Sequence, residues 1–300
     1  MLEEFSSRGA WLKARLKYIT STELPALFGI TKYGQSEFGL FCLKSQLVPS
    51  EYLEEDERMM WGLALQEVIA KTAAHKFGWG LLPTAKEWSL YCDSENKIAS
   101  SIDYIIESKG EKSLLEIKNV DALVFAKDWE ADEHGNYEAP LHIELQLQHQ
   151  MLCTGIESAI LCALVGGNRL VTLKRRPNEK LQELVKQRVG EFWDSVKRKM
   201  KPELKPVDLE WVRRLYSAIG TEVVQASGSA EEIAFNLRVE TQKKKEAENR
   251  CKHLKSQLLD EVGNAKKMLG KDWTLTRSEV AEREITYVRK AYTTDRITWK

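Results

Sequence analysis

The sequence predicts an α/β protein in which a mixed central β-sheet is flanked by helices and followed by a C-terminal helical arm that ends in strands. Three observations predict this class. Segments with strand periodicity alternate with longer segments of helical spacing. The chain has 300 residues, 43% of them hydrophobic, which is enough to bury a sizeable core. Pro202 and Pro206 mark a change of composition, so we expect domains at 1–202 and 203–300.

Composition limits the classes of function. The formal net charge is zero, so binding to nucleic acid would depend on local basic patches. The five cysteines form no CxxC pair and no zinc-like cluster, which indicates buried free thiols in a reducing compartment. The longest apolar run, 159–165, is too short to span a bilayer, and the charged N-terminus has no signal-like core. We expect a soluble intracellular protein without membrane contact.

The segment 98–120 is the central unit of the predicted sheet. Apolar and polar residues alternate on both sides of a polar turn at 108–111, which predicts two antiparallel strands. This pairing places Asp103 opposite Glu116, and Lys118 faces the same space.

Opposed carboxylates on one face repel each other, and a divalent cation removes that repulsion because hard cations bind carboxylate oxygens. In such a site Lys118 could position or activate water, or stabilise a phosphate in the transition state. From this pattern alone the alternative, a half-exposed hairpin with acids on its solvent face, stays open.

The N-terminal region predicts a short helix that ends at Gly29 and a second helix over 37–47. A Thr/Ser run precedes the first helix, where it would cap the N-terminus, and Pro25 suits the first turn. Free N–H groups, a Thr hydroxyl and a nearby Arg form a plausible phosphate pocket. An ordinary capped helix with a surface Arg explains the same residues.

The middle of the chain alternates helices and strands. Helical spacing predicts helices around 62–77, 141–154 and 178–200. Strands are predicted at 88–91, 158–165 and 170–173. Gln148 interrupts the apolar stripe of the second helix, so it is either a satisfied structural amide or part of a site wall.

The last third predicts a long charged helix over 230–269. Apolar residues keep a 3–4 spacing that Glu240 and Lys244 interrupt, which favours a packing arm or hairpin partner over a free coiled coil. Apolar and polar residues alternate in places over 273–300, which predicts one or two terminal strands.

Taken in order, these motifs resemble the YqaJ-type phage recombinases, the group that includes lambda exonuclease, in the PD-(D/E)xK nuclease superfamily. The resemblance runs from about Trp11 to Met200. Ser101-Ile102-Asp103 resembles the (S/P)-x-D motif, and Leu115-Glu116-Ile117-Lys118 resembles L-E-x-K. The segment 146–155 resembles the Q-x-Q-x-x-M helix of the family.

The resemblance implies a restriction-endonuclease-like core and a role for each motif residue. It makes Asp103 and Glu116 ligands of Mg²⁺ or Mn²⁺, with the Ile117 carbonyl as a further ligand, and Lys118 and Gln148 catalytic. Substrate-binding roles fall on the following residues: Arg15 and Thr22 for a 5′-phosphate, and Gln146 for DNA. The family's first helix carries a Glu where this chain has Gln66, followed by Glu67, so either residue could serve as the helix ligand.

The implied function is a 5′→3′ exonuclease on double-stranded DNA ends that acts in phage-type recombination. Partners implied by the resemblance are a single-strand annealing protein and further copies of the chain in a trimer, in a phage or bacterial cytoplasm. A structure-specific endonuclease on the same core, and a DNA-binding protein with a degenerate site, remain alternatives.

Overall fold

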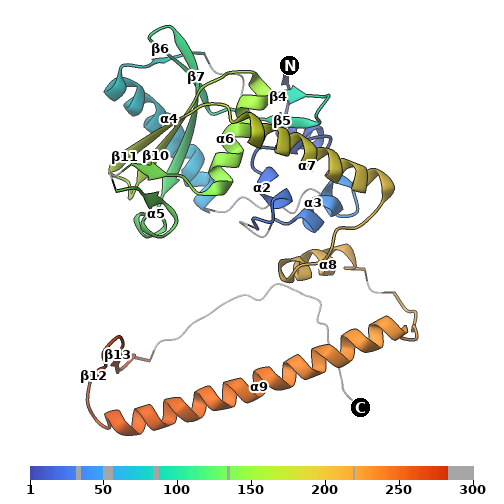
Figure 1. The fold of residues 1–300 in the computed structure, drawn as a ribbon, viewed down its shortest axis with the longest axis vertical. Helices are drawn as coiled ribbons and strands as arrows, with labels where there is room; N and C mark the ends of the chain where they lie inside the picture. The colour runs from blue at the N-terminus through green and yellow to red at the C-terminus, as the bar shows by residue number, and fades with distance from the viewer. Residues whose placement is uncertain (32–34, 50–56, 84–87, 134–135, 219, 283–300) are drawn as a thin grey trace. The chain divides into compact units, whose positions relative to one another are not determined.

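The computed structural model describes residues 1–31, 35–49, 57–83, 88–133, 136–218 and 220–282. Contacts divide the chain into two compact units, Met1–Ser217 and Ala218–Lys300 (Figure 1). The predicted class, mixed sheets flanked by helices with a C-terminal helix, is confirmed. The described residues include no helix long and apolar enough to cross a membrane.

A five-stranded mixed sheet forms the centre of the first unit, in the order β11-β10-β7-β6-β3. Parallel pairing joins β7 to β10, and the other neighbours are antiparallel. These strands are β3 (Gly80–Leu81), β6 (Tyr104–Ser108), β7 (Glu111–Val120), β10 (Ala159–Val165) and β11 (Arg169–Arg175).

Helices cover both faces of this sheet (Figure 1). On one face Ile69 and Ala73 of α4 (Glu57–Phe77) pack in a core cluster with Leu115 and other residues of the sheet. On the other face α6 (Leu141–Thr154) contributes Leu147 to a cluster that contains Leu114 and residues of α5 (Ala122–Asp128). The alternation of Leu114 and Leu115 toward opposite faces therefore sandwiches β7 between helices.

A second, four-stranded sheet has the order β1-β4-β5-β2. Its strands are β1 (Leu2–Glu4), β2 (Ile19–Thr20), β4 (Ser89–Asp93) and β5 (Ile98–Ser100). The prediction of one continuous strand from residue 98 to 107 is therefore wrong, because β5 and β6 belong to different sheets. Asp103 lies in the connection between them.

The turn of the central hairpin is tighter than the predicted four-residue loop. Ser108 pairs with Glu111, which leaves Lys109 and Gly110 as the two loop residues. Both have positive φ, 52° and 78°, as a type I′ hairpin turn requires. The shorter loop keeps the predicted register, since it adds two paired residues at the end of the strands.

A second helical cluster packs around α6. Helices α2 (Leu24–Leu27), α3 (Glu37–Lys44) and α7 (Glu179–Arg198) complete this side of the unit, whereas α1 (Arg8–Arg15) packs against residues of β4 and β5. Their contacts bury Leu27, Phe41, Leu145, Val189 and Phe192 in one cluster. The predicted Thr/Ser cap of the short helix is wrong, because Glu23 occupies the N-cap position without a side-chain cap.

Residues beyond the predicted boundary at 202 still pack on the first unit. A 3-10 turn, Pro206–Asp208, leads into α8 (Leu209–Leu215). Trp211 of α8 is buried against α3, where Gly39 leaves room for its ring. The Asp208 carboxylate, also buried, accepts a hydrogen bond from Ser36. These contacts place the end of the unit after Ser217.

The second unit consists of a long helix and a small hairpin. Helix α9 (Gly228–Val262) ends at Gly263, whose φ is 54°, so the predicted helix does not continue to 269. Two short strands follow, β12 (Lys267–Leu269) and β13 (Thr274–Thr276), and they pair antiparallel. The predicted strand pattern after residue 282 lies outside the described residues. A further small pair, β8 (Glu130–Ala131) and β9 (Tyr137–Glu138), belongs to the first unit.

Candidate active site

The hairpin β6–β7 places Asp103 opposite Glu116. Tyr104 pairs with Leu115, and the same antiparallel register extended by one residue joins the two acids. The Asp103 carboxylate is held in place by the backbone of β7, because its Oδ2 accepts a hydrogen bond of 2.8 Å from the Ile117 N–H. Asp103, directly before β6, and Glu116 of β7 therefore face one site.

Glu116 is buried, with 3% of its surface exposed, and every partner of its carboxylate is a side-chain donor. Its Oε1 accepts hydrogen bonds of 2.6 Å from Lys118 Nζ and 2.6 Å from Gln146 Nε2. Its Oε2 accepts one of 2.7 Å from Gln150 Nε2. Lys118 also donates to Gln146 Oε1 at 2.9 Å. Gln146 and Gln150 lie four residues apart on α6, so one helix face holds the carboxylate.

Asp103 has a strongly raised pKa, about 8 instead of 3.8. Burial is the largest cause, because it disfavours the charged form, and the charge of Glu116 adds to it. Lys118, the Ile117 N–H and the side chain of Gln66 act in the opposite direction. Two carboxyl groups share one lysine, so the site would carry a net negative charge when both acids are ionised.

Of the two candidate helix residues, Gln66 lies beside Asp103, and its side chain lowers the pKa of that carboxyl. The Glu67 side chain is 65% exposed and pairs with Lys71 at 2.5 Å. Consecutive helix residues point about 100° apart, so α4 presents Gln66 to the acids and Glu67 to solvent.

Gln148 does not join the acids in this structure. Its Nε2 donates to the Arg176 carbonyl at 2.9 Å, and its Oε1 accepts from the Asn178 N–H at 2.8 Å. Both ends of the amide are therefore engaged at the start of α7. The residue that contacts the site instead is Gln150, which sequence analysis missed. Its spacing of four from Gln146 was the available signal.

The predicted phosphate-binding residues lie around the start of α2. Arg15 stacks on the Trp11 ring at 4.4 Å and donates to the Thr20 hydroxyl at 3.2 Å. Thr22, the predicted partner, is exposed. Lys44, another residue that the sequence did not reveal, is buried in the apolar helix α3.

Lys44 links these residues into one cluster. Its Nζ donates to the Arg15 carbonyl at 3.0 Å and to Glu23 Oε2 at 2.8 Å. Burial lowers the pKa of Arg15 and of Lys44, while Glu23 opposes both changes. Two cations and one carboxylate leave an excess of positive charge beside the Thr20 hydroxyl.

The donor set between Asp103 and Glu116 suits a hard divalent cation. The described residues contain no cluster of three or more His, Cys, Asp or Glu, so the protein oxygens come from two carboxylates and neighbouring amides. Gln150 Oε1 is buried beside Glu116 and has no hydrogen-bond partner among the described residues. An unpaired buried oxygen and an excess negative charge are both what Mg²⁺ or Mn²⁺ would satisfy.

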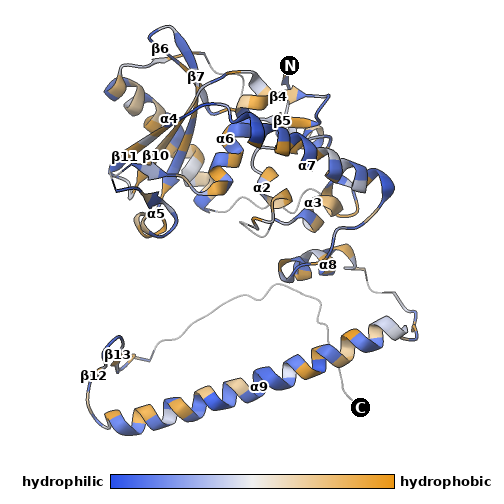
Figure 2. Cartoon of the chain, viewed as in Figure 1, coloured by the Kyte–Doolittle hydropathy of each residue, from blue (hydrophilic) through white to orange (hydrophobic). Residues whose placement is uncertain are grey.

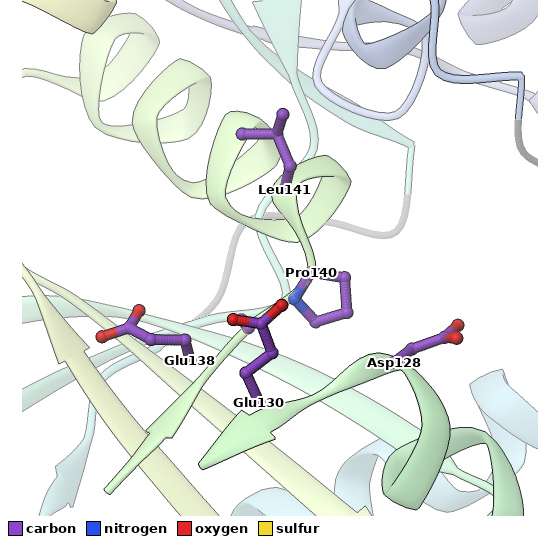
Figure 3. Close-up of a pocket in the computed structure, with 6 residues that line it drawn as sticks. Asp128, Glu130, Glu138, Pro140 and Leu141 are labelled. Atoms are coloured by element: carbon purple, nitrogen blue, oxygen red, sulfur yellow. The ribbon is translucent and has the colours of Figure 1, made fainter. Parts of the chain in front are cut away.

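A separate depression in the surface has a different character (Figure 3). Asp128, Glu130 and Glu138 line it together with Pro140 and Leu141 at the start of α6. Glu138 is paired with Arg175 at 2.8 Å. Its acidic lining would repel a phosphate backbone, which argues against DNA binding at this depression.

The fold and the site together define a mixed α/β domain whose central hairpin presents Asp103, Glu116 and Lys118 as one cluster. Residues 10–157 match the family of the YqaJ-like viral recombinase domain. The matched region contains Asp103, Glu116 and Lys118.

Relatives and solved structures show similarities of different extent. "Uncharacterized protein YqaJ" of Bacillus subtilis (strain 168) is 28% identical over 190 residues, which are 63% of this chain and 56% of the relative. The chain thus spans about half the length of that relative.

Two solved exonucleases show weaker likeness. The alkaline exonuclease LHK-Exo from Laribacter hongkongensis is 16% identical, with a TM-score of 0.49 and coverage of 69% of this chain and 97% of that one. A phage-related exonuclease from Haemophilus somnus 129PT is 13% identical, with a TM-score of 0.39 and coverage of 61% and 96%.

Proposed function

We propose that this protein is a metal-dependent DNA nuclease, and specifically a 5′→3′ exonuclease on double-stranded ends in phage-type recombination. The observation that carries the proposal is the cluster of Asp103, Glu116 and Lys118, in which burial and the charge of Glu116 raise the pKa of Asp103. The match of residues 10–157 to a viral recombinase domain supports an activity on DNA.

The proposed ligands of the cation are Asp103 and Glu116, with Gln66 as a neutral ligand or water holder and the Ile117 carbonyl as a further oxygen. Bound Mg²⁺ or Mn²⁺ would polarise the scissile phosphate and lower the pKa of a bound water.

Lys118 would orient the attacking water or stabilise the charge that develops on the phosphate. Its ammonium is already fixed at 2.6 Å from Glu116 and 2.9 Å from Gln146, so little reorganisation is needed. Gln146 would position Lys118, and Gln150 would hold Glu116. The amide role that the sequence assigned to Gln148 passes in this proposal to these two residues.

The Arg15 cluster supports recognition of a 5′-phosphate. The Arg15 side chain is half-buried and the Lys44 side chain is buried. A terminal phosphate would neutralise the net positive charge of the cluster. Strand pairing places Thr20 of the Arg15 cluster beside Ala99. Asp103 follows Ala99 by four residues, so the short segment 99–103 connects the Arg15 cluster to the Asp103 site. The exposed Thr22 hydroxyl at the start of α2 is the proposed outer contact.

Digestion of duplex DNA tests this function. We expect the protein with Mg²⁺ to degrade linear duplex with 5′-phosphate ends faster than duplex with 5′-hydroxyl ends, and to leave closed circles intact. Lys118→Ala should abolish degradation, and Arg15→Gln should remove the preference for phosphorylated ends. Asp194→Asn, an exposed substitution on α7, serves as control.

Two other outcomes would support the alternatives. Cleavage of closed circles would indicate an endonuclease on the same core. DNA binding without cleavage of any substrate would indicate a degenerate site, for which Gln66 in place of an acid is the specific observation. An annealing protein as partner and assembly with further copies of the chain remain expectations from the family resemblance.

A further inference from the structure

Helix α9 presents a continuous seam of residues spaced three and four apart. The seam residues are exposed, and they are Ala230, Ile233, Leu237, Glu240, Lys244, Ala247, Cys251 and Leu254. Figure 2 shows hydrophobic residues recurring among hydrophilic ones along the whole helix. Only Val262 is buried among the residues of α9. Alternation of three and four over about four heptads is the pattern of a coiled-coil seam.

Glu240 and Lys244 in the middle of the seam exclude one way of pairing two copies. In a parallel, in-register pair each residue faces its own counterpart, so Glu240 would face Glu240 and Lys244 would face Lys244 inside the core. Like charges at desolvated positions are strongly unfavourable. The seam therefore disfavours a parallel pair.

An antiparallel pair with its two-fold axis between Glu240 and Lys244 resolves this conflict. In that register Glu240 of each copy faces Lys244 of the other, so the two charged layers become ion pairs. All remaining layers then join a large residue with a small one: Leu237 with Ala247, Ile233 with Cys251, and Leu254 with Ala230. Interdigitated large and small side chains fill a core without voids.

We propose that α9 binds α9 of a second copy of this chain as an antiparallel coiled coil in this register. The occupant follows from the charge complementarity and the size complementarity of the seam with itself. About four heptads of each helix would overlap, a contact roughly 43 Å long at 1.5 Å per residue. Lys243 of each copy flanks the axis, where an exposed like-charge contact costs little.

The ion pairs that Glu240 and Lys244 make within α9 are weak enough to be replaced by pairs with a second copy. Glu240 accepts from Lys243 at 2.8 Å, and Lys244 lies 3.9 Å from Glu248, all on the exposed surface of one helix. Exposed pairs of this kind contribute little to the stability of a helix. Glu240 and Lys244 can therefore pair with residues of the second copy without disrupting the helix.

Thiol cross-linking of the full chain tests the direction and register. Cys251 is exposed and the other four cysteines are buried, so oxidation reports on this position. We expect no disulfide dimer from the unaltered protein, because the two Cys251 residues lie about 27 Å apart along the antiparallel pair. Ile233→Cys should give a covalent dimer, since the introduced thiol faces Cys251 of the other copy.

Charge exchange tests the register independently, with the Ile233→Cys disulfide dimer as readout. Glu240→Lys alone and Lys244→Glu alone should each reduce the dimer at least tenfold. The double exchange, and a mixture of the two single variants, should restore it. Glu246→Lys, the same charge change off the seam, should have no effect.

Two results would overturn the proposal. A disulfide dimer through Cys251 of the unaltered protein would show a parallel pair. No disulfide dimer from Ile233→Cys, with helix content unchanged by circular dichroism, would show that α9 meets a different partner or none.

Discussion

Replacement of Asp103 with Asn is expected to stabilise the metal-free protein, by an amount that grows with pH. Burial and the charge of Glu116 raise the pKa of Asp103 from 3.8 to about 8. The folded protein therefore retains a proton that the unfolded chain releases. The stability that protonated Asp103 contributes is fully present below about pH 4 and is lost as the pH rises through about 8.

The size of the effect follows from the pKa difference. Each pH unit between the two pKa values costs about 1.4 kcal/mol, which gives an upper limit of about 4 kcal/mol at pH 7. Sharing of charge with Glu116 and relaxation of a half-buried group reduce this cost, so we expect ~2–4 kcal/mol. The Asn oxygen can still accept the hydrogen bond from the Ile117 N–H.

Urea unfolding in EDTA at pH 5 and pH 8 measures this difference. Asp103→Asn should raise the midpoint more at pH 8 than at pH 5, while Asp194→Asn, the exposed control, should change it little. Added Mg²⁺ should stabilise the unaltered protein and not the variant. A variant less stable than the unaltered protein at pH 8, or an equal gain at both pH values, would refute the reasoning.

Further predictions concern the rest of the first unit. Burial lowers the pKa of His149 to about 4, so stability present above pH 6.5 should fall by about 2 kcal/mol at pH 5, and His149→Gln should remove that loss in urea titrations. Gly39→Ala should cost about 1–3 kcal/mol, because a Cβ there would lie 2.4 Å from the Trp211 ring; tryptophan fluorescence during unfolding checks it. Gln148→Ala should lower the unfolding free energy by about 1–3 kcal/mol and leave Mn²⁺ affinity unchanged, whereas Gln150→Ala should weaken Mn²⁺ binding in calorimetry.

The central hairpin could be predicted from the sequence because its information is local. Strand alternation and the polar turn define which residues face each other, so the opposition of Asp103 and Glu116 followed without knowledge of the rest of the fold. The break between β5 and β6 could not be predicted in this way. It depends on β4 and β2, which draw Ile98–Ser100 into another sheet.

Helix α6 shows the limit of periodicity. Its ends were predictable, since Gly155 adopts the left-handed conformation that ends the helix. Its faces were not, because α6 is surrounded and each of its sides meets a different neighbour. Which glutamine reaches Glu116 depends on those neighbours, and Gln148 turned out to face α7.

The buried Lys44 was hidden for a similar reason. It stands in an apolar helix where a charged residue normally reaches solvent, and its partner Glu23 is distant in sequence. Only the tertiary structure brings the two together with Arg15.

Binding of Mn²⁺ to the metal-free protein, followed by the loss of the free-ion electron paramagnetic resonance signal, tests the central claim most directly. We predict that the unaltered protein binds Mn²⁺ at pH 8, that Glu116→Gln and Asp103→Asn weaken binding at least tenfold, and that Glu67→Gln leaves it unchanged. Equal binding by the Glu116→Gln and Asp103→Asn variants and the unaltered protein would contradict the assignment of these two acids as the cation site.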